Sequence, residues 1–253
     1  MTSSIDDFLS QKQQRINDFL QRANTLLPEH NPLFFDGSFI TGQIYHPDML
    51  FIGINPGHRG WHDVTARQQN TRLTDYRNQP CKYIAESITG NRFAKRVIDV
   101  VCGGDSSRLE NCAETSLLSY FASPTESVVK AQIKHLPKAM QLEHAQLTEL
   151  PIHQIKPKHI VCIGWRTFDE FIKRYGQHSD AITRRASTKK LPICIKGEDK
   201  MMDYYTKVKL DGMVIHGVRH FSTPLSQAML EDMRAVFEKV WEDIEISQDT
   251  SPN

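Results

Sequence analysis

Asn55 is the first residue of this chain whose type and setting suggest chemistry. It follows an apolar run typical of a buried strand (residues 49–54) and stands directly before Pro56 and Gly57. Proline fixes φ and glycine allows positive φ, so the turn is expected to be rigid. A side-chain amide held by a rigid turn can keep a water molecule at a fixed point, which is what a hydrolytic reaction requires.

The second candidate is a polar loop that precedes the last expected helix. It reads His220-Phe221-Ser222-Thr223-Pro224-Leu225-Ser226 and offers an imidazole, hydroxyl groups and the start of a helix. Backbone N–H groups at a helix start favour an anion, either a DNA phosphate or the charge on a leaving group. The structural alternative is that both stretches are ordinary turns, with Ser222 or Thr223 capping the helix and Pro224 in its first turn.

Strands and helices alternate along the chain, and these elements must hold the two candidate stretches in place. Apolar spacing of three and four predicts helices at 4–27, 83–101 and 225–246, with Phe8, Leu26 and Ile88 on apolar faces. A polar segment at 127–150 and the residues after Gly164, at 165–175, are also expected to be helical. Short apolar runs predict strands at 49–53, 115–121, 156–164 and 191–195, and a further β run before His220. This order indicates an α/β fold with a mostly parallel sheet, whose ligands bind at the carboxyl ends of the strands. We expect one domain over 1–246 and a disordered tail at 247–253.

Composition limits the class of protein. The 253 residues are 39% hydrophobic, which is enough for a large core, and the formal charge of +1 excludes a global basic field. Five widely spaced cysteines without CxxC pairs favour buried free thiols in a reducing compartment. The sequence shows no signal-peptide pattern and no apolar run of the roughly 20 residues that span a bilayer. We therefore expect a cytoplasmic protein without membrane contact.

Three segments resemble the uracil-DNA glycosylase superfamily. They are GINPG at 53–57, HFSTPLS at 220–226 and the strand-to-helix unit KPKHIVCIGWRTFDEF at 156–171. The first motif is most similar to the mismatch-specific uracil/thymine and the single-strand-selective uracil DNA glycosylases. The resemblance implies a three-layer α/β/α sandwich around a central, mostly parallel four-stranded sheet. It also implies DNA as the substrate and hydrolysis of the base–sugar bond without a metal or cofactor.

The resemblance also implies roles for individual residues. Asn55 matches the residue that positions the attacking water, and His220 matches the histidine that stabilises the departing base. The turn around Asn55 then contributes to the base pocket through Gly53, Ile54, Pro56 and Gly57. By the same resemblance, the second motif contacts DNA phosphates and inserts a wedge into the DNA duplex. Its residues are Ser222, Thr223, Pro224, Leu225 and Ser226.

Two departures from the family pattern bear on the substrate. The second motif is one residue longer than His-Pro-Ser-Pro-Leu-Ser, so an alignment from Pro224 places Phe221 at the histidine position. Ser116 stands where the family has an asparagine that reads the edge of uracil. A short hydroxyl leaves more room and loses a bidentate hydrogen bond, which makes a bulkier or modified pyrimidine a credible substrate.

Further polar and aromatic residues are candidates for DNA contacts. His58 and Arg59 follow the first motif, and Arg184 and Arg185 begin a basic stretch that continues at Lys189 and Lys190. The alternative for this stretch is a solvated loop. His58 and His62 are four apart, but no carboxylate or cysteine at matching spacing accompanies them, so we expect no metal. Trp61, Tyr76 or Phe93 could stack on a flipped base, with core packing as the alternative for Phe93.

The sequence thus predicts a monofunctional DNA N-glycosylase that removes uracil or a modified pyrimidine in base-excision repair. It would bind DNA by flipping the target base, act as a monomer and need no cofactor. Two alternatives stay open. One is a glycosylase for a bulky hypermodified base in phage DNA, with a role in defence. The other is a non-catalytic DNA- or nucleotide-binding protein of the same fold.

Overall fold

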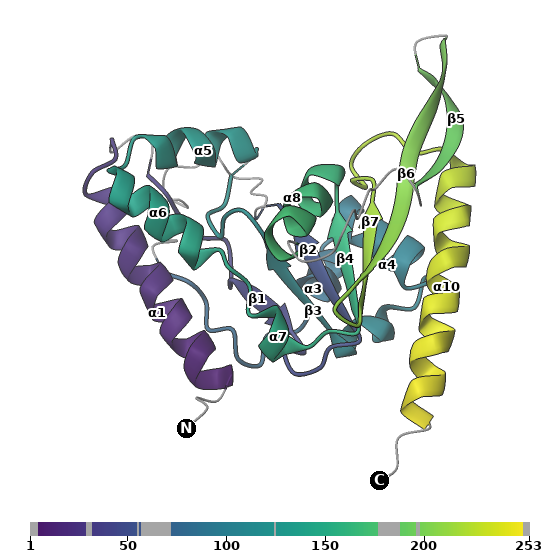
Figure 1. Ribbon diagram of the computed structural model, residues 1–253, viewed down its shortest axis with the longest axis horizontal. Coiled ribbons are helices and arrows are strands. Elements are labelled where there is room, and N and C mark those ends of the chain that lie inside the picture. Colours follow the sequence, from purple (N-terminus) through teal and green to yellow (C-terminus); the bar gives the residue numbers. More distant parts are fainter. Residues whose placement is uncertain are drawn as a thin grey trace. The chain divides into compact units, whose positions relative to one another are not determined.

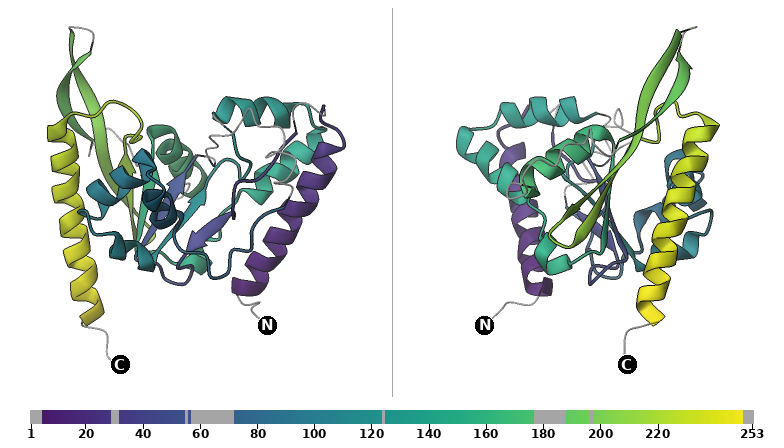
Figure 2. Two further views of the ribbon diagram at one scale, coloured as in Figure 1. Left: turned by 180° about the vertical axis from the view of Figure 1, so that it is seen from behind. Right: turned by 45° about the vertical axis from the view of Figure 1, so that its right-hand side comes forward.

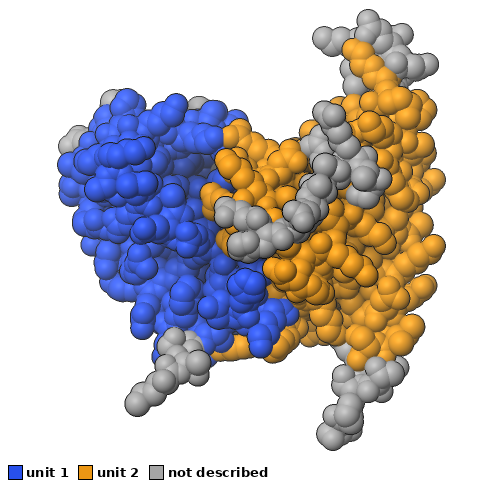
Figure 3. All heavy atoms as spheres, in the orientation of Figure 1, with its two compact units in different colours: residues 1–41, 53–79, 115–156 blue, residues 42–52, 80–114, 157–253 orange. Residues whose placement is uncertain are grey.

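The computed structural model describes residues 5–28, 32–54, 56, 72–123, 125–176, 188–195 and 198–249. The chain divides into two compact units, which Figure 3 shows in two colours. Unit 1 comprises residues 1–41, 53–79 and 115–156, and unit 2 comprises residues 42–52, 80–114 and 157–253. The expectation of one domain over 1–246 stays a prediction.

The described residues form one mixed sheet of seven strands in the order β1-β3-β2-β4-β7-β6-β5 (Figure 1). The strands are β1 (Ile40–Gly42), β2 (Met49–Gly53), β3 (Cys112–Ser116), β4 (His159–Ile163), β5 (Lys189–Ile195), β6 (Glu198–Leu210) and β7 (Met213–Val218). β2, β4 and β7 pair in parallel, whereas β7, β6 and β5 pair antiparallel. The α/β class is confirmed, but the expected count of four strands is too low, because β1 and the antiparallel strands β5 and β6 also belong to the sheet.

Helices occupy most of the remaining described chain. They are α1 (Ile5–Asn24), α3 (Lys82–Ile88), α4 (Arg92–Val101), the 3-10 helix η1 (Ser106–Asn111), α5 (Glu126–Lys134), α6 (Lys138–Leu147), α7 (Ile152–Ile155), α8 (Trp165–Tyr175) and α10 (Gln227–Asp249). Two expected helices are each divided. Gly90 has a φ of 84° and Asn91 caps α4, which separates α3 from α4. Pro137 separates α5 from α6.

In unit 2, helices cover both faces of the sheet (Figures 1 and 2). Side chains alternate across a strand, so Met49 and Phe51 of β2 and Val161 and Ile163 of β4 point to one face. α4 and α10 pack on that face, and α10 contributes a stripe of buried residues at helical spacing: Met229, Met233, Phe237, Val240, Trp241 and Ile244. α8 packs on the other face against β4 and β7. Unit 2 therefore has helices on both faces of its strands.

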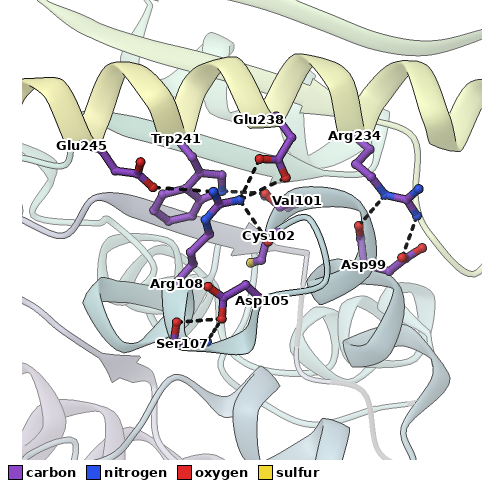
Figure 4. Close-up of polar contacts among 10 residues, drawn as sticks. All are labelled: Asp99, Val101, Cys102, Asp105, Ser107, Arg108, Arg234, Glu238, Trp241 and Glu245. Atoms are coloured by element: carbon purple, nitrogen blue, oxygen red, sulfur yellow. Dashed lines mark hydrogen bonds and ion pairs between the residues drawn. The ribbon is translucent and has the colours of Figure 1, made fainter.

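A polar clamp fixes α10 to α4 and η1 (Figure 4). The indole N–H of Trp241 donates to the carbonyl of Val101 at 2.7 Å. Arg108 reaches both carboxylate oxygens of Glu238, at 3.0 and 3.1 Å, and its guanidinium lies 5.3 Å from the centre of the Trp241 ring. Arg234 pairs with Asp99 at 2.6 Å. These contacts hold α10, and hence the loop that leads into it, against α4.

The β5–β6 ribbon extends beyond the end of β7 (Figure 1). β7 pairs with β6 up to Tyr205, whereas β5 pairs with the earlier residues of β6. The register shifts between Lys189 and Lys190, which leaves Tyr204 as the extra residue of a bulge. Tyr204 donates to Asp232 of α10 at 2.8 Å, and Lys189 pairs with the same carboxylate at 2.8 Å. The base of the ribbon is thus attached to α10.

Unit 1 is built on α1 and an aromatic cluster. Phe121 stacks on Phe19, Phe35 and His144 at ring-centre distances of 5.4 to 5.8 Å. Lys12 also faces inward, with 6% of its surface exposed, and donates to the carbonyl of Glu149. The sequence pattern gave no indication of this buried lysine.

Several expectations about individual residues are wrong. Phe8, Leu26 and Ile88 are 38%, 54% and 82% exposed, because each lies off the buried stripe or at a helix end. The strand expected at 115–121 is β3 at Cys112–Ser116, and Phe121 instead forms an isolated bridge with Phe35. Helix α10 continues to Asp249, so residues 247–249 are helical rather than part of a disordered tail, and residues 250–253 lie outside the described chain.

Among the cysteines whose side chains the structure describes, four are free and buried, as expected: Cys81, Cys102, Cys112 and Cys162. Burial raises the pKa of the Cys81 thiol to about 12, which makes it unreactive at neutral pH. Among the helices of the described residues, none has the length and apolar character needed to cross a bilayer.

Candidate active site

The candidate site in unit 2 lies where β4 and β7 end. The two strands are parallel and in register from His159↔Val214 to Ile163↔Val218, so the residues that follow them emerge at one edge. Gly164 follows β4 and donates from its backbone N–H to the carbonyl of Val218 at 2.8 Å. A Cβ placed on Gly164 would lie 3.6 Å from Cδ2 of His220. The backbone of Gly164 therefore borders the imidazole of His220.

Ser222 defines the protonation of the His220 ring. Its backbone N–H donates to Nδ1 of His220 at 3.3 Å, and its hydroxyl oxygen lies 2.6 Å from the same nitrogen. A nitrogen that accepts a backbone N–H carries no proton of its own, so the hydroxyl also donates to Nδ1. In the neutral ring the proton is then on Nε2, and His220 presents one N–H donor away from its own loop.

The surroundings of His220 favour the neutral ring. Burial lowers the pKa of His220 below its ordinary value. The ring is also bordered by Gly164, the N-cap of α8, and it packs on the ring of Phe93. The N-terminal end of a helix carries a partial positive charge, which disfavours imidazolium and favours an anion. The site can therefore donate a hydrogen bond to a group that becomes negative.

The rest of the second motif supports this loop and starts α10. Ser226 caps α10, its hydroxyl oxygen accepting from the N–H of Met229 at 3.3 Å. Ser222 and Thr223 do not cap it: Ser222 contacts the imidazole and Thr223 donates to the carbonyl of His220 at 2.6 Å. The alternative that Ser222 or Thr223 is the helix cap is therefore wrong.

Three other residues of this motif differ in exposure. Phe221 is 1% exposed and belongs to the core of unit 2, where its ring lies 6.1 Å from that of Phe93. Leu225 is partly buried against the same core, and Pro224 is exposed. Phe221 thus anchors the loop in the core of unit 2. The role of Phe221 in a base pocket and the wedge role of Leu225 stay predictions.

The first motif belongs to unit 1, and three of its residues are described. The carbonyls of Gly53, Ile54 and Pro56 accept from the N–H groups of Leu117, Leu118 and Ser123 at 2.9, 3.0 and 3.1 Å. These three bonds hold the backbone at Gly53, Ile54 and Pro56, and the rigid turn itself stays a prediction. Asn55 itself lies outside the described residues.

Ser116 is the last residue of β3, directly before the segment that holds the first motif. Its side chain is buried, with 4% of its surface exposed. The position thus carries one small hydroxyl inside the protein, and a role in reading a base stays a prediction.

Several predicted contact residues also lie outside the described chain. These are Gly57, His58, Arg59, Arg184 and Arg185. Lys189 and Lys190, which continue the basic stretch, pair with Asp232 and Asp203 at 2.8 and 3.4 Å. The first motif belongs to unit 1 and the second to unit 2. The contacts described here are therefore contacts within one unit.

Two residues of the site were not expected from the sequence. Arg96 of α4 donates from Nη1 to the carbonyl of Phe221 at 2.5 Å, and Gly164 borders the imidazole. Phe93, for which base stacking and core packing were both considered, packs on the His220 ring at a centre distance of 5.0 Å. Tyr76, also considered for base stacking, is 1% exposed in the core of unit 1. Helical spacing could have placed Phe93 and Arg96 on one face, but no pattern identifies what that face contacts.

The described residues offer no group of three or more His, Cys, Asp or Glu side chains arranged to hold a metal ion. A comparison with protein-family models gives no match, and neither does a comparison with curated proteins. Any function must therefore be argued from the geometry of the site and from the two motifs.

Proposed function

We propose that this protein is a monofunctional DNA N-glycosylase that hydrolyses the bond between deoxyribose and uracil or a modified pyrimidine. It would act as a monomer on DNA and without a cofactor, in a uracil-DNA glycosylase-like α/β/α fold. The observation that carries the proposal is the imidazole of His220 at the carboxyl edge of β4 and β7, whose Nδ1 accepts from the backbone N–H of Ser222 inside a motif that resembles that superfamily.

The chemistry of the site suits this reaction. Cleavage of a glycosidic bond builds negative charge on the departing base and positive charge on the sugar. An N–H donor that is already oriented and partly desolvated stabilises the negative charge without reorganisation, which is the main source of such catalysis. The Nε2–H of His220 is such a donor. The N-terminus of α8, which adjoins the ring, also favours negative charge.

The first motif supplies the second requirement, a positioned water. The backbone at Gly53, Ile54 and Pro56 is held by hydrogen bonds to Leu117, Leu118 and Ser123. We propose that the Asn55 amide holds the attacking water. The remaining residues of the turn and Ser116 would line the base pocket, and the polar residues of the second motif would contact phosphates.

The test is incubation of the purified full chain with oligonucleotides that contain uracil, a G·T mismatch or a modified pyrimidine. Both single and double strands are used, and alkali then cleaves any abasic site. We expect strand cleavage that is strongly reduced in His220→Gln and Asn55→Ala. Absence of abasic product from every substrate would refute the proposal. Unchanged DNA binding by Asn55→Ala, together with no turnover by either protein, would instead indicate a non-catalytic binder.

Ser116 favours a second candidate substrate. A buried single hydroxyl cannot make the two hydrogen bonds that an asparagine makes to uracil, and it occupies less space. A bulky hypermodified base, such as those of phage DNA, is therefore the alternative, with a role in defence. Release of bases from phage DNA, with uracil DNA left intact, would support this alternative over uracil repair.

A further inference from the structure

The N-terminal half of α4 contacts the His220 loop at two points. The ring of Phe93 lies 5.0 Å from the His220 ring, centre to centre, with 37° between the planes. One turn later, Arg96 donates from Nη1 to the carbonyl of Phe221 at 2.5 Å. Residues three apart lie on the same side of a helix, so Phe93 and Arg96 present one surface to this loop.

α4 is itself firmly held at this end. The side chain of Asn91 caps the helix, accepting from the N–H groups of Phe93 and Ala94 at 2.9 and 3.4 Å. Further along α4, Ala94, Val97, Ile98, Val100 and Val101 are buried in the core of unit 2. The contacts from Phe93 and Arg96 therefore come from an element with a fixed position.

The orientation of the His220 ring depends on contacts from outside its own loop. Ser222 fixes which nitrogen of the ring is protonated, but Ser222 is two residues away in the same loop and moves with it. The direction of Nε2–H relative to the sheet must come from contacts outside the loop. Among the described residues, Gly164 borders the ring on one side, and Phe93 packs on the ring from α4.

We propose that Phe93 and Arg96 are positioning residues for His220: Phe93 packs on the imidazole and Arg96 holds the carbonyl of the next residue, so that Nε2–H points in one fixed direction. The inference rests on the proposed function for its catalytic consequence. The orientation of the ring itself can be measured without any substrate. Neither residue needs to touch the substrate for this role.

The variants are Phe93→Leu and Arg96→Ala, with Phe93→Tyr and Arg96→Lys as conservative counterparts. Lys95→Ala is the matched control, because Lys95 is an exposed cationic residue on the same turn of α4. The first readout is the ¹⁵N spectrum of the histidine rings, in which His220 is assigned from its loss in His220→Gln. It reports which nitrogen carries the proton and how well the ring is ordered.

We expect the wild type, Lys95→Ala and Phe93→Tyr to show His220 protonated on Nε2 alone. Phe93→Leu and Arg96→Ala should show exchange broadening or a mixture of the two neutral forms, and Arg96→Lys should recover most of the wild-type spectrum. On a substrate that the wild type cleaves, kcat should fall about tenfold or more with KM changed less than about twofold, since misplacement of a catalytic group affects the transition state.

A His220 spectrum and a kcat that match those of Lys95→Ala in both Phe93→Leu and Arg96→Ala would overturn the inference. Thermal melts identify any variant that has lost the fold. Spectra and kcat are then compared at a temperature at which every variant in the comparison is folded. Failure of the wild type to release any base refutes the proposed function, and the spectra then decide the positioning role alone. The two failures are thus distinguishable.

Discussion

His220 and Ser222 contact each other twice, through the backbone N–H of Ser222 at 3.3 Å from Nδ1 and through its hydroxyl oxygen at 2.6 Å. The backbone contact is independent of the side chain at position 222. The loop therefore sets the protonated nitrogen of its histidine by its own conformation, and the hydroxyl adds to that preference.

Ser222→Ala should accordingly retain the Nε2-protonated form of His220. The backbone N–H still donates to Nδ1, and the lost hydroxyl bond is worth about 1 kcal/mol. We expect a reduction in kcat of less than about tenfold. The ¹⁵N shifts of the His220 ring provide the measurement. A switch to the Nδ1-protonated ring would show that the hydroxyl, and not the backbone, sets the tautomer.

The pH dependence of activity should reflect the lowered pKa of His220. Burial keeps the ring neutral below the ordinary histidine pKa of about 6.5, so the Nε2–H donor with an unprotonated Nδ1 persists into mildly acidic solution. We expect kcat/KM to stay level as the pH falls through 6.5 and to decline at lower pH, where a proton on Nδ1 would break its contact with the backbone N–H of Ser222, which orients the ring. In His220→Gln the residual activity should lack that decline. A midpoint at or above the ordinary value would contradict this prediction.

The sequence predicted the parallel part of the fold well because its signals are local. β2 at Met49–Gly53 and α8 at Trp165–Tyr175 agree with the expected ranges, since an unbroken apolar run and a strong helical period leave few alternatives. The division between α3 and α4 was missed because the apolar spacing continues across Gly90 and Asn91. There the positive φ of Gly90 and the cap by Asn91 outweigh the periodic pattern.

The candidate site was predictable in its residue types but not in its contacts. Polar residues after apolar runs identified His220 and Ser222 as candidates, but the same residues also fit an ordinary helix cap. That choice depends on which hydroxyl reaches the first turn of α10, and Ser226 does so. Arg96 lies 125 positions from Phe221, and no local pattern records a contact at that separation.

A buried chain of hydrogen bonds should make the stability of unit 2 depend on pH. Nδ1 of His216 lies 2.9 Å from the hydroxyl of Tyr205, and its Nε2 lies 3.1 Å from Nδ1 of His159. Burial lowers the pKa of His216 to about 3, whereas the unfolded chain titrates near its ordinary value of about 6.5. Between these values the unfolded state binds the extra proton, so the free energy of unfolding falls with falling pH, by up to about 1.4 kcal/mol per pH unit.

Replacement of His216 by Gln should remove this contribution to the slope. The matched control is His153→Gln, since His153 is exposed at the surface of unit 1. Urea unfolding at several pH values between about 6 and 4 gives both slopes, and other acidic groups contribute equally to the two proteins. Equal slopes in the two variants would show that His216 does not carry the effect.

Lys12 should affect stability in the alkaline range. Burial lowers its pKa to about 7, whereas an unfolded lysine keeps its proton up to about 10.4. Between these values the unfolded state binds more protons, so the free energy of unfolding rises with pH through the contribution of Lys12. Lys12→Met should flatten the profile between about pH 7 and 10, and Lys138→Met, at an exposed position of α6, should not. Denaturant unfolding across this range is the measurement, and a rise that persists in Lys12→Met would contradict it.

Gly217 of β7 lies close to Phe168 of α8 and to Thr206 of β6. A Cβ at this position would lie 2.7 Å from Cδ2 of Phe168 and 2.8 Å from Cγ2 of Thr206. Both neighbours are buried, with 1% and 0% of their surfaces exposed, so neither can move into solvent. Gly217→Ala should therefore overpack the interface and lower the free energy of unfolding by about 1–3 kcal/mol.

Thr206→Ser tests whether steric conflict is the cause, because it removes the methyl group that the new Cβ would meet. Alone, it should cost about 1 kcal/mol through the lost burial of that methyl group. In the Gly217→Ala protein it should cost less or even restore stability, since the space it vacates accommodates the added Cβ. Urea unfolding of the two single variants and the double variant gives the coupling energy. Additive effects would place the cost of alanine elsewhere, in the backbone of β7 or in the packing of Phe168.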